Sequence, residues 1–221
     1  MSPPWAPTPT GYASGQMLDH VFTDAIGALR DAFEGAFLER QAFEEHFQSD
    51  VLLGDLTWET SYGLPGEGSP PRVVSHITLD WPSWSQAMYR RWYLEETLVE
   101  LPAIEIEIVF RVQRLAEQPD HRQVLTLTPA TSPIIGNAGM ERAGLATEIS
   151  HPLDSSGKVE YALEVTYEGL YDLAEETLAD GASTLLDNHF GALGGWIAAT
   201  LVKLGDLTLA YLPPESPDLQ A

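Results

Sequence analysis

The chain contains no cysteine among its 221 residues. Disulfide bonds and metal sites built on thiolates are therefore excluded. The absence of cysteine does not fix the compartment, because many secreted proteins also lack it.

Basic residues are scarce, and this shortage limits the partners that the protein can bind. Lysine and arginine together number 11 against 33 aspartates and glutamates, which gives a net charge of −22. The only lysines are Lys158 and Lys203. Because such a charge repels phosphates and anionic lipid headgroups, we expect no direct binding of nucleic acid and no membrane binding.

A leader sequence and a long apolar run are also missing. The first residues, MSPPWAPTPTGYASG, have neither a basic start nor an apolar stretch. The longest apolar stretch, Phe190 to Val202, is shorter than the roughly 20 residues that span a bilayer. We therefore expect a cytoplasmic protein without a recognisable export signal or membrane span.

No complete catalytic, nucleotide or metal motif occurs in the sequence. It has no Walker pattern, no GxGxxG, no GxSxG elbow, and no two histidines at the HExxH spacing. We expect no catalytic residues, no metal and no cofactor. One pair of acids remains open: Glu105 and Glu107 lie on one face of a predicted strand, roughly 7 Å apart. This pair is typical of a solvated strand face, and it is also compatible with acid–base chemistry.

The chain divides into three parts by composition. Residues 1–16 carry prolines at positions 3, 4, 7 and 9, which predict an extended arm with Trp5 and Tyr12 as anchors. Residues 17–212 contain the periodic patterns and predict a single α+β domain. Residues 213–221 predict a loose tail.

The hydrophobic periods within residues 17–212 predict helices at both ends and strands between them. The predicted helices are Met17–Gln48, Ser83–Val99 and Leu170–Leu204. Gly35 allows a break in the first of them, and the last is read as one or two helices interrupted around Gly191, Gly194 and Gly195. The predicted strands are Val51–Tyr62, Val73–Trp81, Ala103–Leu115, Arg122–Thr128, Leu145–Leu153, Val159–Tyr167 and Leu207–Leu212. We expect 103–115 to form a hairpin with 122–128, and 145–153 with 159–167. The predicted fold is α+β, with a mostly antiparallel sheet packed against a long N-terminal helix and C-terminal helices.

Glycine spacing in the last predicted helix indicates close packing. Gly191 and Gly195 stand four residues apart within GALGGWIAATLVKLG. Outside a membrane, this spacing allows two helix backbones to approach each other. We expect that contact to be made within the chain.

The densest aromatic cluster of the chain occurs in LDWPSWSQAMYRRWYLEE. Large rings beside arginines are typical of contact surfaces between proteins, and the same rings are also compatible with a core. Five aromatic residues in this short segment exceed what one helix face can bury. The candidate interface residues are Trp5, Tyr12, Trp84, Tyr89, Arg90, Arg91, Trp92, Arg111 and Arg114.

These features favour a non-enzymatic structural or assembly protein that contacts itself and neighbouring subunits as a homo-oligomer. An N-terminal helix, the strand IEIEIVFRVQRL, the late strand VEYALEVTYEGLY and closing helical material resemble tailed-phage tail-terminator and head–tail completion proteins. The resemblance is one of element order and covers residues 17–170. It implies a ring, hexameric in that family, that caps a tail tube, and a location in the virion.

Two other function classes stay open at this point. A ligand-binding domain would use a curved sheet, with Trp58, Trp81, Tyr161 and Tyr167 lining a pocket. A hydrolase or metal enzyme would use Glu105, Glu107 and a histidine that converge on one point.

Overall fold

The computed structural model describes residues 19–36, 39–40, 46–49, 54–64, 70–93, 97–98, 100–136, 139–150, 159–173 and 182–213. Its helices are α1 (Asp19–Gly35), α2 (Ser83–Tyr93), α3 (His121–Leu127) and α5 (Ala182–Gly205). Its strands are β1 (Glu39–Arg40), β2 (His46–Ser49), β3 (Leu56–Gly63), β4 (Val73–Trp81), β5 (Ala103–Leu115), β6 (Glu141–Ser150) and β7 (Glu160–Asp172).

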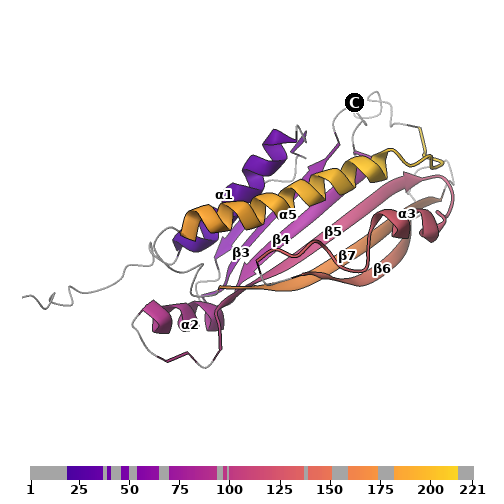
Figure 1. Cartoon of the computed structure of the whole chain (residues 1–221). Helices are drawn as coiled ribbons and strands as arrows, with labels where there is room; N and C mark the ends of the chain where they lie inside the picture. Colours follow the sequence, from indigo (N-terminus) through magenta and orange to yellow (C-terminus); the bar gives the residue numbers. More distant parts are fainter. Residues whose placement is uncertain are drawn as a thin grey trace, which may run out of the picture.

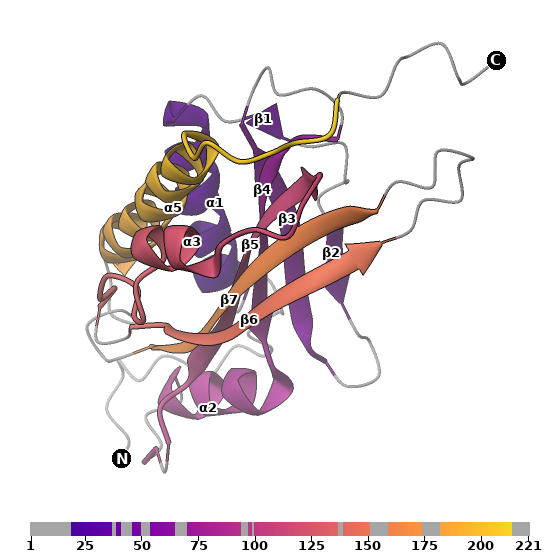
Figure 2. The same cartoon turned by 90° about the vertical axis from the view of Figure 1, so that its right-hand side faces the viewer.

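The strands form one antiparallel sheet with the order β1-β3-β4-β5-β7-β6, and β2 also pairs with β3. Helices α1 and α5 pack against each other and cover one face of this sheet (Figure 1). Figure 2 shows that the two helices lie on the same side, while α2 lies at one end of the strands. The fold is therefore α+β with an antiparallel sheet, as the sequence predicts.

Alternation along β5 determines which side of the sheet is covered. Ile104, Ile106 and Ile108 are buried, whereas Glu105 and Glu107 between them are exposed. Successive strand residues point to opposite faces, so the isoleucines meet the helices and the glutamates face away from them. The predicted bounds of β4 and β5 are confirmed.

The helices bring aromatic rings onto the covered face. Phe22 of α1 lies 6.0 Å from the ring of Trp81, and Phe33 lies 4.1 Å from Tyr62. Trp196 of α5 meets Phe110 at 5.5 Å. These rings belong to one hydrophobic core that extends in sequence from Val21 to Leu204.

Helix α1 ends at Gly35, so the prediction of one helix up to Gln48 is wrong. Glu39–Arg40 and His46–Ser49 form β1 and β2, and both pair with β3. Backbone hydrogen bonds to β3 form at these residues, so pairing in the sheet outweighs the high helix propensity of a segment rich in Glu, Arg, Gln and Ala. Strand β3 itself begins at Leu56, later than predicted.

The segment predicted as a strand over Arg122–Thr128 is helix α3, so its expected hairpin with β5 is wrong. Asp120 caps this helix, because its side chain accepts a hydrogen bond from the backbone N–H of Arg122. Strand β5 pairs instead with β4 and β7. The predicted pairing of the next two strands is confirmed, since β6 pairs with β7.

Other elements also differ from their predicted bounds. Strand β6 begins at Glu141, four residues before the predicted start. Helix α2 ends at Tyr93, and residues 97–98 are not helical. Strand β7 continues to Asp172, so the helix predicted to start at Leu170 does not. The predicted last strand, 207–212, is reduced to an isolated bridge between Tyr211 and Leu115.

Close packing of α5 depends on Gly194, although the spacing in the sequence pointed to Gly191 and Gly195. A Cβ atom at Gly194 would lie 2.7 Å from the Cβ of Ala32 on α1. At the two predicted glycines, a Cβ would have nothing within 4 Å. The contact is made within the chain, and α5 runs through all three glycines without a break.

Candidate functional site

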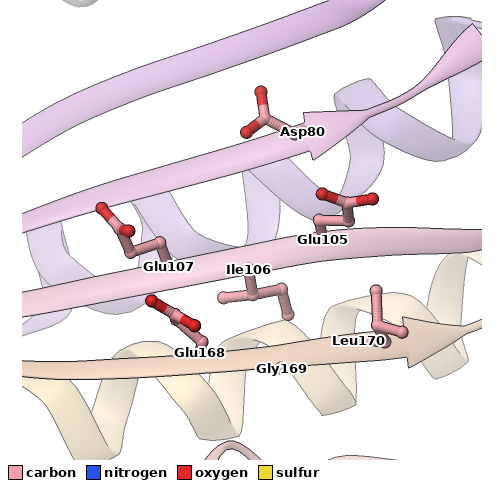
Figure 3. Close-up of a pocket in the computed structure, with 7 residues that line it drawn as sticks. All are labelled: Asp80, Glu105, Ile106, Glu107, Glu168, Gly169 and Leu170. Atoms are coloured by element: carbon pink, nitrogen blue, oxygen red, sulfur yellow. The ribbon is translucent and has the colours of Figure 1, made fainter. Parts of the chain in front are cut away.

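The open face of the sheet, opposite α1 and α5, carries a shallow acidic trough. Cross-strand register brings its acids together: Glu105 is opposite both Asp80 and Leu170, and Glu107 is opposite Glu168. Figure 3 shows these side chains side by side on β4, β5 and β7. The trough has a volume of about 400 Å³ and is lined by Asp80, Glu105, Ile106, Glu107, Glu168, Gly169 and Leu170.

The acids of the trough act on one another. Partial burial raises the pKa of Glu107, and the charges of Glu168, Asp80 and Glu59 raise it further. No basic side chain lines the trough. Its electrostatic potential is therefore negative, and it favours cationic groups.

Glu105 and Glu107 share one strand face, as predicted, but the trough lacks the imidazole that a hydrolase hypothesis requires. Its lining contains carboxylates and no histidine. Across the described ranges, no group of three or more histidines and acids is placed to hold a metal ion. The geometry around this pair therefore fits a solvated strand face.

One histidine of the open face contacts a serine. The Oγ of Ser61 lies 2.6 Å from Nδ1 of His76, directly across β3 and β4. Burial lowers the pKa of His76, and the nearby charge of Arg111 lowers it further, so the ring is neutral near pH 7. Ser61 is buried in the middle of a strand pair, where backbone N–H groups serve the sheet instead of forming an oxyanion hole. We interpret this pair as a cross-strand contact of the sheet.

Arg111, a predicted interface residue, is neutralised within the chain. Its guanidinium pairs with Glu164 and, at 2.6 Å, with Glu148. Burial alone would lower the pKa of Arg111, but the two glutamates outweigh it and raise the pKa above its ordinary value. Arg111 therefore joins β5, β6 and β7, and its charge is already satisfied.

Arg114, also predicted at the interface, is buried with 4% of its surface exposed. It lies in a bulge with φ 62° and donates to the carbonyl oxygens of Pro70 and Pro213. Because β5 is flanked by β4 and β7, Arg111 and Arg114 do not form a sheet edge. Both arginines are therefore engaged within the chain, and a contact of either with a partner stays a prediction.

Helix α2 presents part of its predicted interface to solvent. Trp84, Ala87 and Arg90 follow one another at three-residue steps on its exposed side, and Trp84 is 38% exposed. Arg91 is partly buried and makes contacts within the chain. Trp84 and Arg90 therefore have the exposure that the interface prediction requires.

The remaining rings of α2 belong to the core side. Tyr89 is buried and packs edge-on against Trp81 at 5.7 Å. Trp92 is partly buried and stacks on Tyr89 at 5.9 Å. The ring contacts of Tyr89 and Trp92 therefore lie within the chain, and an interface role for either stays a prediction.

The residues predicted to line a ligand pocket fill the core instead. Trp58, Trp81 and Tyr167 are buried among its largest side chains, and Tyr161 packs against the core from its margin. Trp5 and Tyr12, the predicted anchors of the arm, lie outside the described residues.

The sequence did not reveal Asp80 and Glu168 as neighbours of Glu105 and Glu107. The only available signal was strand register, because acids on three strands become one cluster when β4, β5 and β7 align. The alternation of polar and apolar residues assigned each acid to a face of the sheet. It could not identify which strand lies next to the strand that carries the acid.

No helix in the described part of the chain combines the length and the apolar composition that a membrane crossing needs. No protein-family model, no curated protein and no solved structure matches this chain.

Proposed function

We propose that this chain is a non-enzymatic assembly protein that acts through protein–protein contacts in an oligomer. The observation that carries the proposal is the exposed side of α2, where Trp84 and Arg90 face solvent. Tryptophan and arginine are the side chains most enriched at the energetic centres of protein interfaces.

Helix α2 is held firmly, so its outer side is presented in a fixed position. The Oγ of Ser85 donates to the carbonyl oxygen of Ala103 and accepts from its backbone N–H, at 2.7 Å in each case. Gln86 donates to the carbonyl oxygens of Gly54 and Trp81. A contact surface that is fixed before binding loses less conformational entropy when a partner docks.

Two more exposed apolar side chains lie at the same end of the sheet. Leu101, 41% exposed, precedes the Ala103 that α2 contacts, and Leu170, 51% exposed, is opposite Glu105. Apolar side chains near an exposed tryptophan provide the buried area that a stable contact requires. The partner in this proposal is the acidic surface of a neighbouring subunit, which Arg90 would contact.

More specifically, we propose that the protein is a tail-terminator or neck component of a virion. This proposal rests on the resemblance in element order stated in the sequence analysis. In that setting the protein would contact itself and neighbouring subunits, without binding nucleic acid or membrane directly. Its net charge of −22 disfavours nucleic acid and anionic membranes as partners.

The test is light scattering of the full chain over a range of micromolar concentrations, for wild type and Trp84→Ala. We expect a wild-type oligomer that Trp84→Ala weakens by at least about tenfold, the equivalent of about 1.4 kcal/mol, with little change in melting temperature. Trp92→Ala is the matched control, and it should lower the melting temperature because Trp92 packs on Tyr89. A monomeric wild type would overturn the proposal, as would an oligomer that Trp84→Ala leaves unchanged.

A further inference from the structure

Among the described residues, the sheet ends at β6, a long strand with much of its outer side unpaired. Strand β6 stands last in the strand order, and β7 is the one strand of the described ranges that pairs with it. The strands at the opposite end, β1 and β2, have 2 and 4 residues, whereas β6 has 10. Natural sheets usually shorten, cover or charge their edge strands, since an open edge pairs with other chains.

Part of this edge is already covered by the chain itself. Arg142 donates its backbone N–H to Ala130, and Thr131 forms a bridge with Glu141. Beyond a bulge at residue 143, no backbone partner other than β7 is found among the described residues for Gly144–Ser150. This stretch, the β6 edge, offers the N–H and C=O groups of alternate residues to an incoming strand.

The apolar side chains of the β6 edge are compatible with pairing, whereas the Oγ1 of Thr147 is already engaged with α3, 2.8 Å from Nε2 of His121. Ile149 is 57% exposed, and Leu145 is partly buried on the same side of the strand. Glu148 is bound by Arg111, which reduces the charge on the other side. The edge carries no lysine and no proline between 144 and 150; its protections are the bulge at residue 143 and Glu148, whose charge is paired with Arg111.

We propose that the β6 edge pairs in antiparallel fashion with the β6 edge of a second copy of this chain, around a two-fold axis at Thr147. In this register Leu145 is opposite Ile149 of the second copy, so two exposed isoleucines become covered. Centring the pair on Glu148 would place like charges directly opposite each other, which is unfavourable. Centring it on Ala146 would leave Ile149 opposite the bulge.

A second copy fits this edge better than the N-terminal arm. Prolines 3, 4, 7 and 9 have no backbone N–H, so residues 1–9 cannot provide a regular ladder. The two-fold pair gives each copy the same hydrogen-bonding groups and the same Leu145–Ile149 contact, as an isologous interface requires. The inference deepens the oligomer of the proposed function and uses a surface separate from α2.

The absence of native cysteine makes a direct cross-linking test possible. Residues opposite each other in an antiparallel pair have Cα atoms about 4.5–5.5 Å apart, within the usual disulfide range of about 4.4–6.8 Å. We therefore expect Thr147→Cys to form a covalent dimer under mild oxidation at 0.15 M salt. Ala146→Cys, which would face Glu148 of the second copy, and Val202→Cys on the exposed side of α5 are the controls.

A second variant tests the same contact without a disulfide. Ile149→Lys should weaken dimerisation by at least about tenfold, since it places a charge where the pairing would bury an isoleucine. Val202→Lys, at an exposed valine of similar size on α5, should leave dimerisation unchanged. Both variants should keep the melting temperature of the wild type.

The outcomes separate this inference from the proposed function. Equal cross-linking of all three cysteine variants, or none at Thr147→Cys, would overturn the pairing of β6. An oligomer that responds to Trp84→Ala but not to Ile149→Lys would also overturn it, and would leave the role of α2 supported. A monomeric wild type would overturn both proposals.

Discussion

The two faces of β5 carry the same backbone and opposite chemistry. On one face Ile104, Ile106 and Ile108 lie under α1 and α5, where they are almost fully buried. On the other face Glu105 and Glu107 line an open trough. The covered face stabilises the fold, and the open face determines the charge that the sheet presents to its surroundings.

The difference shows how far a binary pattern determines a surface. The covered positions of β5 from Ile104 to Val112 all carry aliphatic or aromatic side chains, because a close-packed core needs side chains that fill its volume. The open positions change from acids near α2 to the Arg111 cluster further along the strand. Their chemistry depends on neighbouring strands, so it is set by register and not by alternation.

The largest expected effect on stability comes from shortening a side chain on the covered face. The same truncation at the neighbouring open-face residue serves as its control. Ile108→Ala should lower the free energy of unfolding by about 2–5 kcal/mol, because it leaves a cavity beneath the helices. Val109→Ala, one residue along on the open face, should cost about 1 kcal/mol or less. Urea unfolding of both variants measures the difference, and equal losses would contradict the assignment of faces.

A smaller effect is expected where α5 approaches α1 above the covered face. Gly194→Ala should destabilise the fold by about 1–3 kcal/mol, since the new Cβ overlaps that of Ala32. Gly195→Ala has open space around it and should stabilise the helix by about 0.5–1 kcal/mol. Thermal unfolding of the two variants compares adjacent positions. A stabilised Gly194→Ala variant would contradict the close approach of the helices.

The smallest effect concerns the acids of the open face. The pKa of Glu107 is raised in the folded state, so between the ordinary and the raised pKa the folded chain binds more protons there than the unfolded chain. Stability therefore falls as pH rises through that range. Glu107→Gln should therefore add roughly 0.5 kcal/mol at pH 7 and low salt. The gain should disappear below the ordinary glutamate pKa.

A matched substitution on the same face should change the stability in the opposite direction. Glu164→Gln removes a carboxylate that pairs with Arg111, so it should destabilise the fold at pH 7. Urea unfolding at several pH values, in low salt, measures both variants. A destabilised Glu107→Gln variant at pH 7 would contradict the repulsion within the trough.

Sequence patterns predicted the elements that have a clear hydrophobic period. They failed where contacts with distant segments determine the secondary structure. Strands β4 and β5 were predicted to their observed ends, because their alternation is long and uninterrupted. Residues 39–40 and 46–49 form strands by pairing with β3, which their own side chains do not indicate. For α3, the signal was Asp120 as a helix cap, and it is easily missed before a helix of only 7 residues.

The candidate surface was predictable only in part. The segment around Trp84 was identified by its aromatic content, but the inward side of α2 could not be separated from the outward side. The burial of Arg114 was not predictable, because it depends on a bulge with positive φ and on the carbonyl groups of Pro70 and Pro213. Such contacts join segments far apart in sequence, so no local pattern reports them.

The hydrogen bonds of Arg114 also place the C-terminal segment and α2 at opposite ends of the molecule. Its guanidinium binds the carbonyl of Pro213, and its own carbonyl accepts from Leu212, so the C-terminal segment is attached where β5 ends. Helix α2 is attached at the other end of the same 13-residue strand, which is about 40 Å away. A fluorescent label attached at Pro213 would therefore lie at the pole of the molecule opposite α2, and energy transfer between labelled copies would report how they are oriented.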